Sequence, residues 1–227
     1  MLATLTARLG VWQLDRAAQK IALQQSLRER GALPVLDAQA LARRPQDAAA
    51  QVQRRAVLTG RWLATRTVYL DNRPMHGRVG FTVVTPLQLA DGSAVLVERG
   101  WLPRDFQDRT HITPPPTPPG DVTIDGQLAP GPSRLYEFAT DARGPIRQNL
   151  DPDRFAQEIG VPLRPRSLRQ TGGDAADGLA RDWPAPATDV QKHYGYAFQW
   201  FALCALTIVL YVWFRILRPR RVAARRA

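Results

Sequence analysis

The longest apolar run in the chain lies near its C-terminus and predicts a membrane helix. Residues 194–214 are 21 consecutive positions without a charged side chain, and among them only Gln199 is strongly polar. At about 1.5 Å per residue, a helix of this length matches the roughly 30 Å hydrocarbon core of a bilayer. Tyrosine and tryptophan gather at both ends, as in interfacial belts, whereas a soluble core helix rarely runs this long without a polar face. We therefore expect a transmembrane helix at 193–217 and a basic tail at 218–227.

The N-terminal segment is also apolar, but its interpretation differs. Residues 1–12 contain a single arginine and are too short to cross a bilayer before the charged Asp15. They lack the basic start and small-residue cleavage site of a signal peptide. Apolar residues at near-helical spacing continue to Arg30, and Gly31 and Pro34 are expected to end the helix. We expect region 1–30 to be a helix that either begins at the membrane interface or is the remnant of a first transmembrane segment.

Between the two apolar ends, the pattern changes to short strands. Runs rich in β-branched and aromatic residues predict strands at 55–59, 67–70, 79–85, 94–98 and 122–128. Turns are expected at 91–92, where the residues are typical of a hairpin, and at 71–74. Two short helices are also expected. One runs from Asp151 to Gly160, and the other lies at 37–53 and is broken at Pro45. We expect an α+β membrane protein, with a mostly β extramembrane domain at 31–192.

Charge indicates how the chain lies in the membrane. The net charge is +11, and six arginines without any acidic residue follow the apolar run. The positive-inside rule places this tail in the cytoplasm and the main domain on the opposite, periplasmic side. Because the tail accounts for more than half of the net charge, the basic composition indicates contact with anionic membrane lipid rather than nucleic acid.

Few side chains have the spacing of a reactive site. Cys204 is the single cysteine and lies inside the apolar run, so neither a disulfide within the chain nor a copper site of paired thiolates is expected. His76 lies in a predicted turn and His111 beside the proline run 114–119, which reads as an extended loop or, alternatively, a proline-motif ligand. Neither histidine has a partner at ligand spacing, so no zinc site is expected. No catalytic motif is present, and we expect a protein that is not an enzyme.

His193 differs from the other histidines because it is the last polar residue before the apolar run. On a helix it shares one stripe with Ala197, Trp200 and Cys204. A neutral imidazole at the edge of an apolar, aromatic surface is suited to be an axial haem ligand. The alternative is a solvated histidine at the membrane interface, and residue chemistry leaves both interpretations open.

Several segments, in order along nearly the whole chain, resemble those of the surfeit locus protein 1 family, which assists assembly of cytochrome c oxidase. Each segment is weak evidence alone, but the ordered set is specific. The segments are Leu9-Gly-Val-Trp-Gln-Leu-Asp-Arg16 with Lys20, Val57-Leu-Thr-Gly60, Tyr69-Leu-Asp-Asn72, Gly80-Phe-Thr-Val-Val-Thr-Pro86, Val95-Leu-Val-Glu-Arg-Gly-Trp-Leu-Pro103, Asn149-Leu-Asp151 and His193-Tyr-Gly-Tyr-Ala-Phe-Gln-Trp200.

The resemblance implies a membrane-bound assembly factor in the bacterial inner membrane, acting in respiratory chain biogenesis. Its implied cofactor is haem a, bound transiently at His193 with Tyr196 and Trp200 beside it. Its implied partners are subunit I of an aa3-type oxidase, haem a synthase and membrane lipid. Two other hypotheses stay open: a cofactor-free scaffold that binds subunit I, and a membrane-tethered enzyme whose site has no familiar motif.

The chain departs from the family pattern in two respects. The family's first membrane helix is mostly absent from the sequence, and Gln191 and Lys192 replace its usual asparagines before the histidine. Glu98 stands where asparagine is common. These changes keep His193, and Lys192 would add a positive charge suited to a haem propionate.

Overall fold

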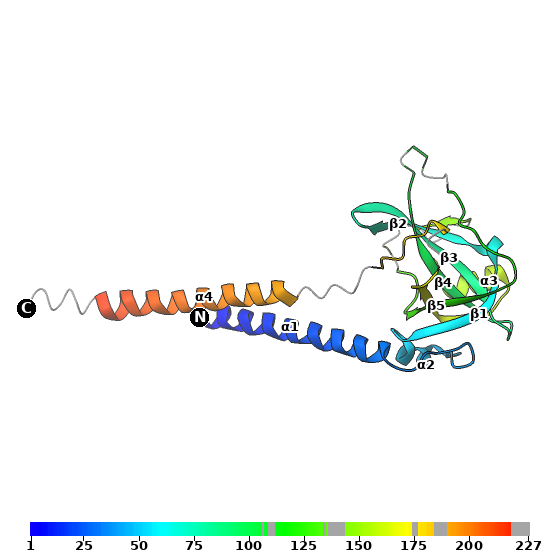
Figure 1. The fold of residues 1–227 in the computed structure, drawn as a ribbon. Coiled ribbons are helices and arrows are strands. Elements are labelled where there is room, and N and C mark those ends of the chain that lie inside the picture. Colours follow the sequence, from blue (N-terminus) through cyan, green and yellow to red (C-terminus); the bar gives the residue numbers. More distant parts are fainter. Residues whose placement is uncertain are drawn as a thin grey trace, which may run out of the picture. The chain divides into compact units, whose positions relative to one another are not determined.

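The chain forms two compact units in a computed structural model. One unit comprises residues 1–27 and 185–227, and the other comprises residues 28–184. Figure 1 shows the helices of the first unit and the strands of the second. The structure describes residues 1–105, 107–108, 112–133, 135, 144–173, 177–183 and 190–218.

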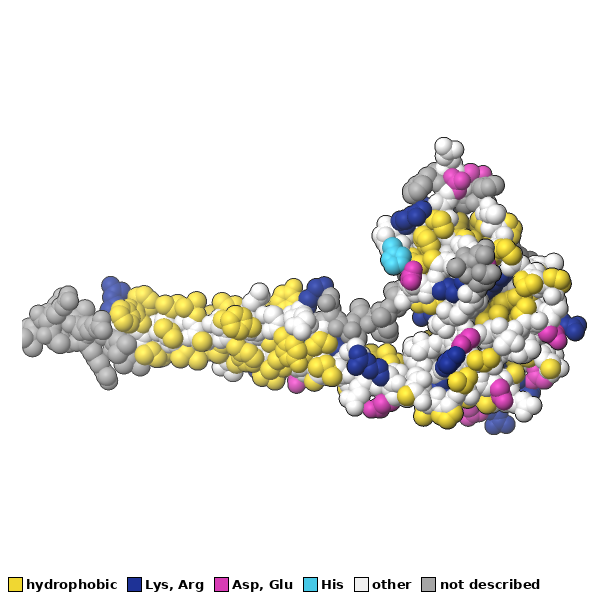
Figure 2. All heavy atoms as spheres, viewed as in Figure 1, with side chains coloured by type: hydrophobic (Ala, Val, Ile, Leu, Met, Phe, Trp, Pro, Cys, Tyr) yellow, Lys and Arg dark blue, Asp and Glu magenta, His cyan; other side chains and the backbone are white. Residues whose placement is uncertain are grey.

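The helical unit is built from two long helices. Helix α1 (Leu2–Gly31) is continuous, so the apolar start of the chain forms its first turns; its last residues belong to the β unit. Helix α4 (Val190–Val212) continues into a π-helical turn, η4 (Trp213–Leu217). Among the described residues, Val190–Arg215 is the one helix long and apolar enough to cross a membrane. Apolar side chains cover much of the visible surface of the helical unit, as Figure 2 shows.

The β unit is a seven-stranded mixed sheet that closes on itself. The strand order is β1-β5-β7-β4-β3-β2-β6, and β1 also pairs with β3, which closes a ring of β1, β3, β4, β7 and β5. The pairs β4–β7 and β2–β6 are parallel and the others antiparallel. Ring closure leaves these five strands without a free outer edge of the sheet, which is instead formed by β6 next to β2. The strands are β1 (Arg55–Trp62), β2 (Val68–Met75), β3 (Arg78–Gln88), β4 (Ala94–Pro103), β5 (Asp121–Ala129), β6 (Ile146–Arg147) and β7 (Leu163–Gln170).

The fold class is confirmed at the level of a mixed sheet with helices, a candidate membrane helix at the C-terminus and a helix at the N-terminus. The hairpin at Asp91–Gly92 is present, and Gly92 adopts the positive φ of 80° that this turn requires. Helix α3 (Pro152–Ile159) begins and ends as predicted, because the Asp151 carboxylate accepts hydrogen bonds from the Asp153 and Arg154 amides and Gly160 is left-handed.

Two local predictions were wrong. Residues 71–74 do not form a turn but lie within β2, where a bulge between Leu70 and Arg73 and a left-handed Asn72 (φ 61°) absorb the irregularity. The turn comes later, at His76–Gly77. Pro45 does not break a helix but begins α2 (Pro45–Ala48), which passes into the 3-10 turn η1 (Ala49–Gln51). Proline in a first turn loses no helical hydrogen bond. A further 3-10 turn, η2 (Ala64–Arg66), links β1 to β2.

The β4 segment Glu98-Arg-Gly-Trp101 links several parts of the β unit. The buried Trp101 Nε1 donates to the Arg73 carbonyl at 2.7 Å. Gly100 permits close approach, since a Cβ there would lie 2.6 Å from the Leu179 Cβ. Glu98 accepts from Ser167 Oγ at 2.7 Å and pairs with Arg169 on β7. This segment therefore holds β4 to β2 and β7 through side chains as well as through the sheet.

Candidate functional site

His193 contacts a glutamine of the first helix. Its Nδ1 lies 2.7 Å from the Gln13 Oε1. The amide oxygen is an acceptor, so Nδ1 of the neutral ring carries the proton and donates to Gln13. Among the described residues, no hydrogen bond to the other ring nitrogen, Nε2, is found. The contact leaves the Nε2 lone pair available, which is the arrangement of a metal-ligating histidine whose second nitrogen is held by a protein acceptor.

Small residues allow the two helices to pack closely around this contact. Thr6, Gly10 and Ala17 are buried on one face of α1, and Ala197 is buried on α4. A Cβ at Gly10 would lie 2.8 Å from the Phe201 ring, so only glycine permits the observed packing. Further along, Cys204 Sγ donates to the Ala3 carbonyl at 3.2 Å. Small residues at such interfaces let helix backbones approach each other in membranes.

The aromatic residues predicted to line the site occupy different environments. Trp200 lies two turns from His193 on a similar face of α4 and is half-buried. Tyr196 is 52% exposed. Within the described residues, no hydrogen bond joins either side chain to His193. The observed partner of His193 is therefore Gln13, while Tyr196 and Trp200 provide aromatic surface next to it.

His76 does not take part in the Gln13–His193 contact. His76 is 68% exposed, and its Nε2 lies 3.4 Å from an Asp182 carboxylate oxygen. His111 lies outside the described residues. Within the part of the chain that the structure describes, no cluster of three or more His, Cys, Asp or Glu side chains has the geometry of a metal site.

Gln13 is the residue that sequence reasoning missed. It lies in Leu9–Arg16, one of the segments that carry the family resemblance, and this was the only feature of the sequence that could have singled it out. Helical spacing does not pair it with His193, because the two residues lie on different helices. Their proximity depends on how α1 and α4 pack.

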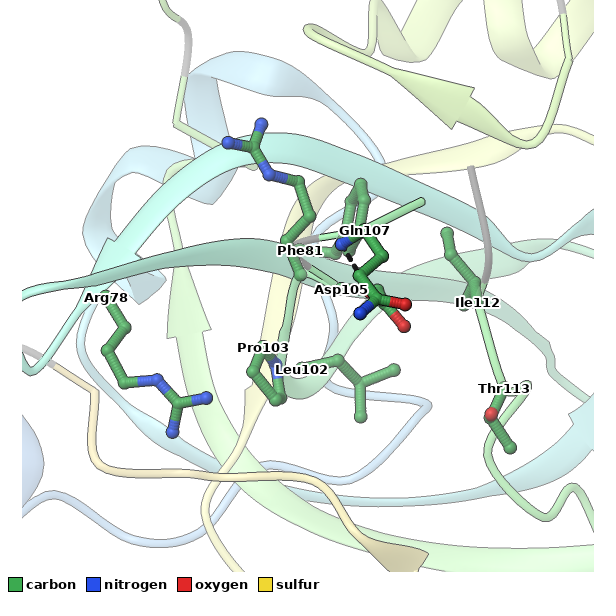
Figure 3. Close-up of a pocket in the computed structure, with 9 residues that line it drawn as sticks. Arg78, Phe81, Leu102, Pro103, Asp105, Gln107, Ile112 and Thr113 are labelled. Carbon is green, nitrogen blue, oxygen red and sulfur yellow. Dashed lines mark hydrogen bonds between the residues drawn. The ribbon is translucent and has the colours of Figure 1, made fainter. Parts of the chain in front are cut away.

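A cavity of about 580 Å³ in the β unit offers a different surface (Figure 3). Phe81 and Leu102 form part of its apolar wall. The Asp105 carboxylate accepts from the Gln107 amide at 2.7 Å and the Asp108 amide at 3.3 Å. Arg78 at its edge is exposed to solvent. The polar groups named here are hydrogen-bonded or hydrated and call for no ligand.

Comparison with known proteins gives one consistent result. A family model described as the SURF1 family matches residues 1–205. A SURF1-like protein of Rickettsia felis is 25% identical over 225 residues, covering 93% of this chain and 92% of its own length. SURF1-like proteins of Rickettsia bellii and Monosiga brevicollis are each 26% identical, covering 89% and 92% of this chain and 83% of their own lengths.

Proposed function

Because this chain belongs to the SURF1 family of cytochrome c oxidase assembly factors, which is not a catalytic family, we propose that it holds haem a for delivery to subunit I of an aa3-type oxidase. The observation that carries the proposal is the Gln13–His193 contact of 2.7 Å. The contact sets the tautomer of the neutral imidazole, with the proton on Nδ1 and the lone pair on Nε2. When bound, haem a would supply an iron centre for which histidine nitrogen is an ordinary axial ligand.

The surroundings of His193 fit such a group. Helix α4 continues from His193 as an almost uncharged apolar helix, and Tyr196 adds an exposed aromatic ring. In this proposal His193 would hold the iron, Gln13 would orient the imidazole, and Trp200 and Tyr196 would offer apolar, aromatic surface to the group. Such a surface would exclude water and so strengthen electrostatic interactions at the site.

We place the site at the outer face of a bacterial inner membrane. Helix α4 has the length and composition of a membrane span. The arginines that follow the span favour a cytoplasmic C-terminus, which puts His193 and the β unit on the periplasmic side. The partners that this position implies are subunit I as acceptor and haem a synthase as donor, with anionic lipid around the basic tail.

The experiment is a spectrum of the full chain purified after co-expression with haem a synthase. We expect a Soret band that His193→Ala removes. His76→Ala is the matched control, because His76 is exposed and its ion-pair partner is Asp182 rather than a residue of the candidate site. Haem retained at full occupancy in His193→Ala would contradict the proposed ligand. Absence of haem from every preparation, together with a stable subunit I complex that survives His193→Ala, would favour a cofactor-free scaffold.

A further inference from the structure

Arg99 on β4 is a buried arginine without an ion pair. The residue is 3% exposed. Its Nη1 donates to Thr117 Oγ1 at 2.9 Å, and its Nη2 donates to the Pro116 carbonyl at 2.7 Å. Its guanidinium lies 4.8 Å from the centre of the Trp62 ring. The Nε has no hydrogen-bond partner, and no carboxylate of the described residues lies within ion-pair distance of Arg99.

Other buried arginines of the β unit show what Arg99 lacks. Arg164 pairs with Asp91 at 2.7 Å, and Arg147 pairs with Glu158 at 2.5 Å. A buried charge is costly unless a counter-charge or hydrogen bonds replace the lost water. Burial lowers the pKa of the Arg99 guanidinium, while Asp177 raises it and Arg181 lowers it. Within the described residues, no ion pair therefore offsets the positive charge of Arg99.

Arg99 lies in the wall of a cavity of about 680 Å³. This volume is within the usual range for small-ligand sites. The proline run contributes Pro116 and Pro118, so it forms a rigid wall of the cavity as well as accepting a hydrogen bond from Arg99. Trp62, Val122 and Ile124 complete an apolar surface. The cavity thus combines an apolar body with one cationic group.

A second polar group of the same wall lacks a partner. Gln170 is 6% exposed and lines the cavity. Its Nε2 donates to the Gly172 carbonyl at 2.8 Å, which leaves Oε1 as a buried acceptor with no donor. Buried polar groups without partners are rare in native proteins and mark places where a ligand or water completes the bonding.

Among the described residues that line the cavity, the one acidic residue is Asp177, and its charge is already neutralised. Both carboxylate oxygens of Asp177 bond to Arg181, one of them at 3.3 Å, and Oδ1 also accepts from the Leu179 amide at 3.0 Å. The Arg181–Asp177 pair therefore adds no net charge to the cavity. Arg99 determines its sign, and that sign is positive.

We propose that this cavity binds a small organic carboxylate with an apolar or aromatic body and one hydrogen-bond donor. The carboxylate pairs with the Arg99 guanidinium, whose planar fork suits a carboxylate. The body lies against Trp62 and the proline wall, and the donor reaches Gln170 Oε1. This site lies within the β unit and does not depend on haem binding by His193.

The test is calorimetric titration of the full chain in lipid nanodiscs with indole-3-acetate, with empty nanodiscs subtracted. Indole-3-acetamide removes the ligand charge, and 1-naphthaleneacetate removes the N–H donor. We expect the acetamide to bind at least about 10-fold more weakly, since a hydrogen bond to a charged group contributes roughly 1.5–3 kcal/mol. Naphthaleneacetate should bind several-fold more weakly than indole-3-acetate, because a neutral hydrogen bond contributes less than one to a charged group.

Two variants approach the cavity independently. Arg99→Gln removes the charge, and Val122→Phe fills the cavity while leaving Arg99 in place. Each should weaken indole-3-acetate binding by about 10-fold or more. Arg73→Gln is the matched control, because Arg73 is also buried with unpartnered nitrogens but does not line this cavity. Circular dichroism checks that each variant folds.

The outcomes separate clearly. No binding of indole-3-acetate at millimolar concentration, or equal binding of acid and amide, overturns the proposal. Unchanged binding in folded Val122→Phe overturns it even if Arg99→Gln fails to fold. A short peptide with a C-terminal tryptophan that binds far more tightly than indole-3-acetate would assign the carboxylate to a chain end and overturn the small-molecule assignment. None of these results bears on the haem spectrum.

Discussion

Gln13 Oε1 lies 2.7 Å from His193 Nδ1, although 180 positions separate the two residues along the chain. The contact joins the two terminal segments that carry the family resemblance. The Gln13 acceptor on α1 determines which nitrogen of the His193 imidazole on α4 carries the proton. This gives a physical reason why the two segments lie together. Helix α1 therefore takes part in the candidate site.

Removing the acceptor should weaken haem binding without removing the ligand. Gln13→Leu keeps a side chain of similar size but leaves Nδ1–H without a partner. Loss of such an outer-shell partner typically lowers affinity for a bound metal by about 10-fold or more. We expect a similar fall in the Soret absorbance per protein after purification at limiting haem. Gln13→Glu should retain haem and lower its reduction potential, because a carboxylate acceptor makes the imidazole more electron-donating.

Gln19→Leu is the control for this series, because Gln19 is an exposed residue of the same helix that contacts Arg16. It should leave both haem content and potential unchanged. Equal haem content and equal potential in wild type, Gln13→Leu and Gln13→Glu would show that Gln13 does not orient His193.

The packing of Phe201 on Gly10 should be sensitive to any larger side chain. In Gly10→Leu the new Cβ would meet the Phe201 ring at 2.8 Å, and overpacking of this kind costs about 1–3 kcal/mol. The native Cys204 contacts the Ala3 carbonyl, so an Ala3→Cys background offers one intrachain disulfide that reports helix pairing. We expect Gly10→Leu to lower the yield of this disulfide on mild oxidation of membranes.

Two further variants complete this test. Phe201→Ala should restore the disulfide yield in the Gly10→Leu background, because it removes the clashing ring. Gly195→Leu is the matched control, since no atom lies within 4 Å of a Cβ at that position. A yield unaffected by Gly10→Leu would mean that the two helices do not pack through this glycine.

Local signals in the sequence were sufficient for most of the elements. Clear start and stop residues define α3: Asp151 caps its N-terminus, Pro152 lies in its first turn, and Gly160 ends it. The Asp91–Gly92 hairpin and the β-branched runs of β3 and β4 were equally direct. Strand β7 was missed because it reads Leu-Arg-Pro-Arg-Ser-Leu-Arg-Gln, with charged residues where buried ones are expected. Its Arg164 is nevertheless buried, because Asp91 neutralises it.

The site was predictable only in part, for a related reason. His193 stood out by its place at the edge of the apolar run, which is a property of the local sequence. Its Gln13 partner and the cavity around Arg99 depend on residues far apart in the chain. The proline wall, Arg99 and Gln170 come from three separate segments, and only the sheet register between β4, β5 and β7 brings them together.

The buried Glu98 should be necessary for the stability of the β unit. Its Oε1 accepts from Ser167 and its Oε2 accepts from Arg169 Nε and Nη2, both at 3.3 Å. Glu98→Gln leaves Arg169 without its counter-charge, and breaking a buried pair costs about 3 kcal/mol. Thermal unfolding should show a clear fall in Tm. The double variant Glu98→Gln/Arg169→Gln should unfold at a higher temperature than the sum of the single variants predicts, and strict additivity would show that the pair is not coupled.

Asp91 should make the stability of the β unit depend on acid pH. Its Oδ2 accepts from Arg43 and from the buried Arg164, and its Oδ1 accepts from Ser93. The Ser93 hydroxyl is the main cause that lowers the Asp91 pKa, with the two arginines adding to it. A lowered pKa in the folded state means that the carboxylate stabilises the fold at every pH above its unfolded pKa of about 3.9.

This stabilisation is lost as the pH falls through the lower pKa of the folded state. Asp91→Asn should therefore destabilise the protein by about 2 kcal/mol between pH 5 and 7, because it leaves the buried Arg164 without its counter-charge. The difference from wild type should shrink as the pH falls from the unfolded pKa through the lower folded-state pKa of Asp91, where the wild-type carboxylate also becomes protonated. Denaturant unfolding across this pH range measures it. Asp121→Asn is the control, because Asp121 pairs with the exposed Arg61 and its loss should leave the unfolding midpoint unchanged. A gap between wild type and Asp91→Asn that stays constant down to pH 2 would show that the Asp91 charge contributes nothing.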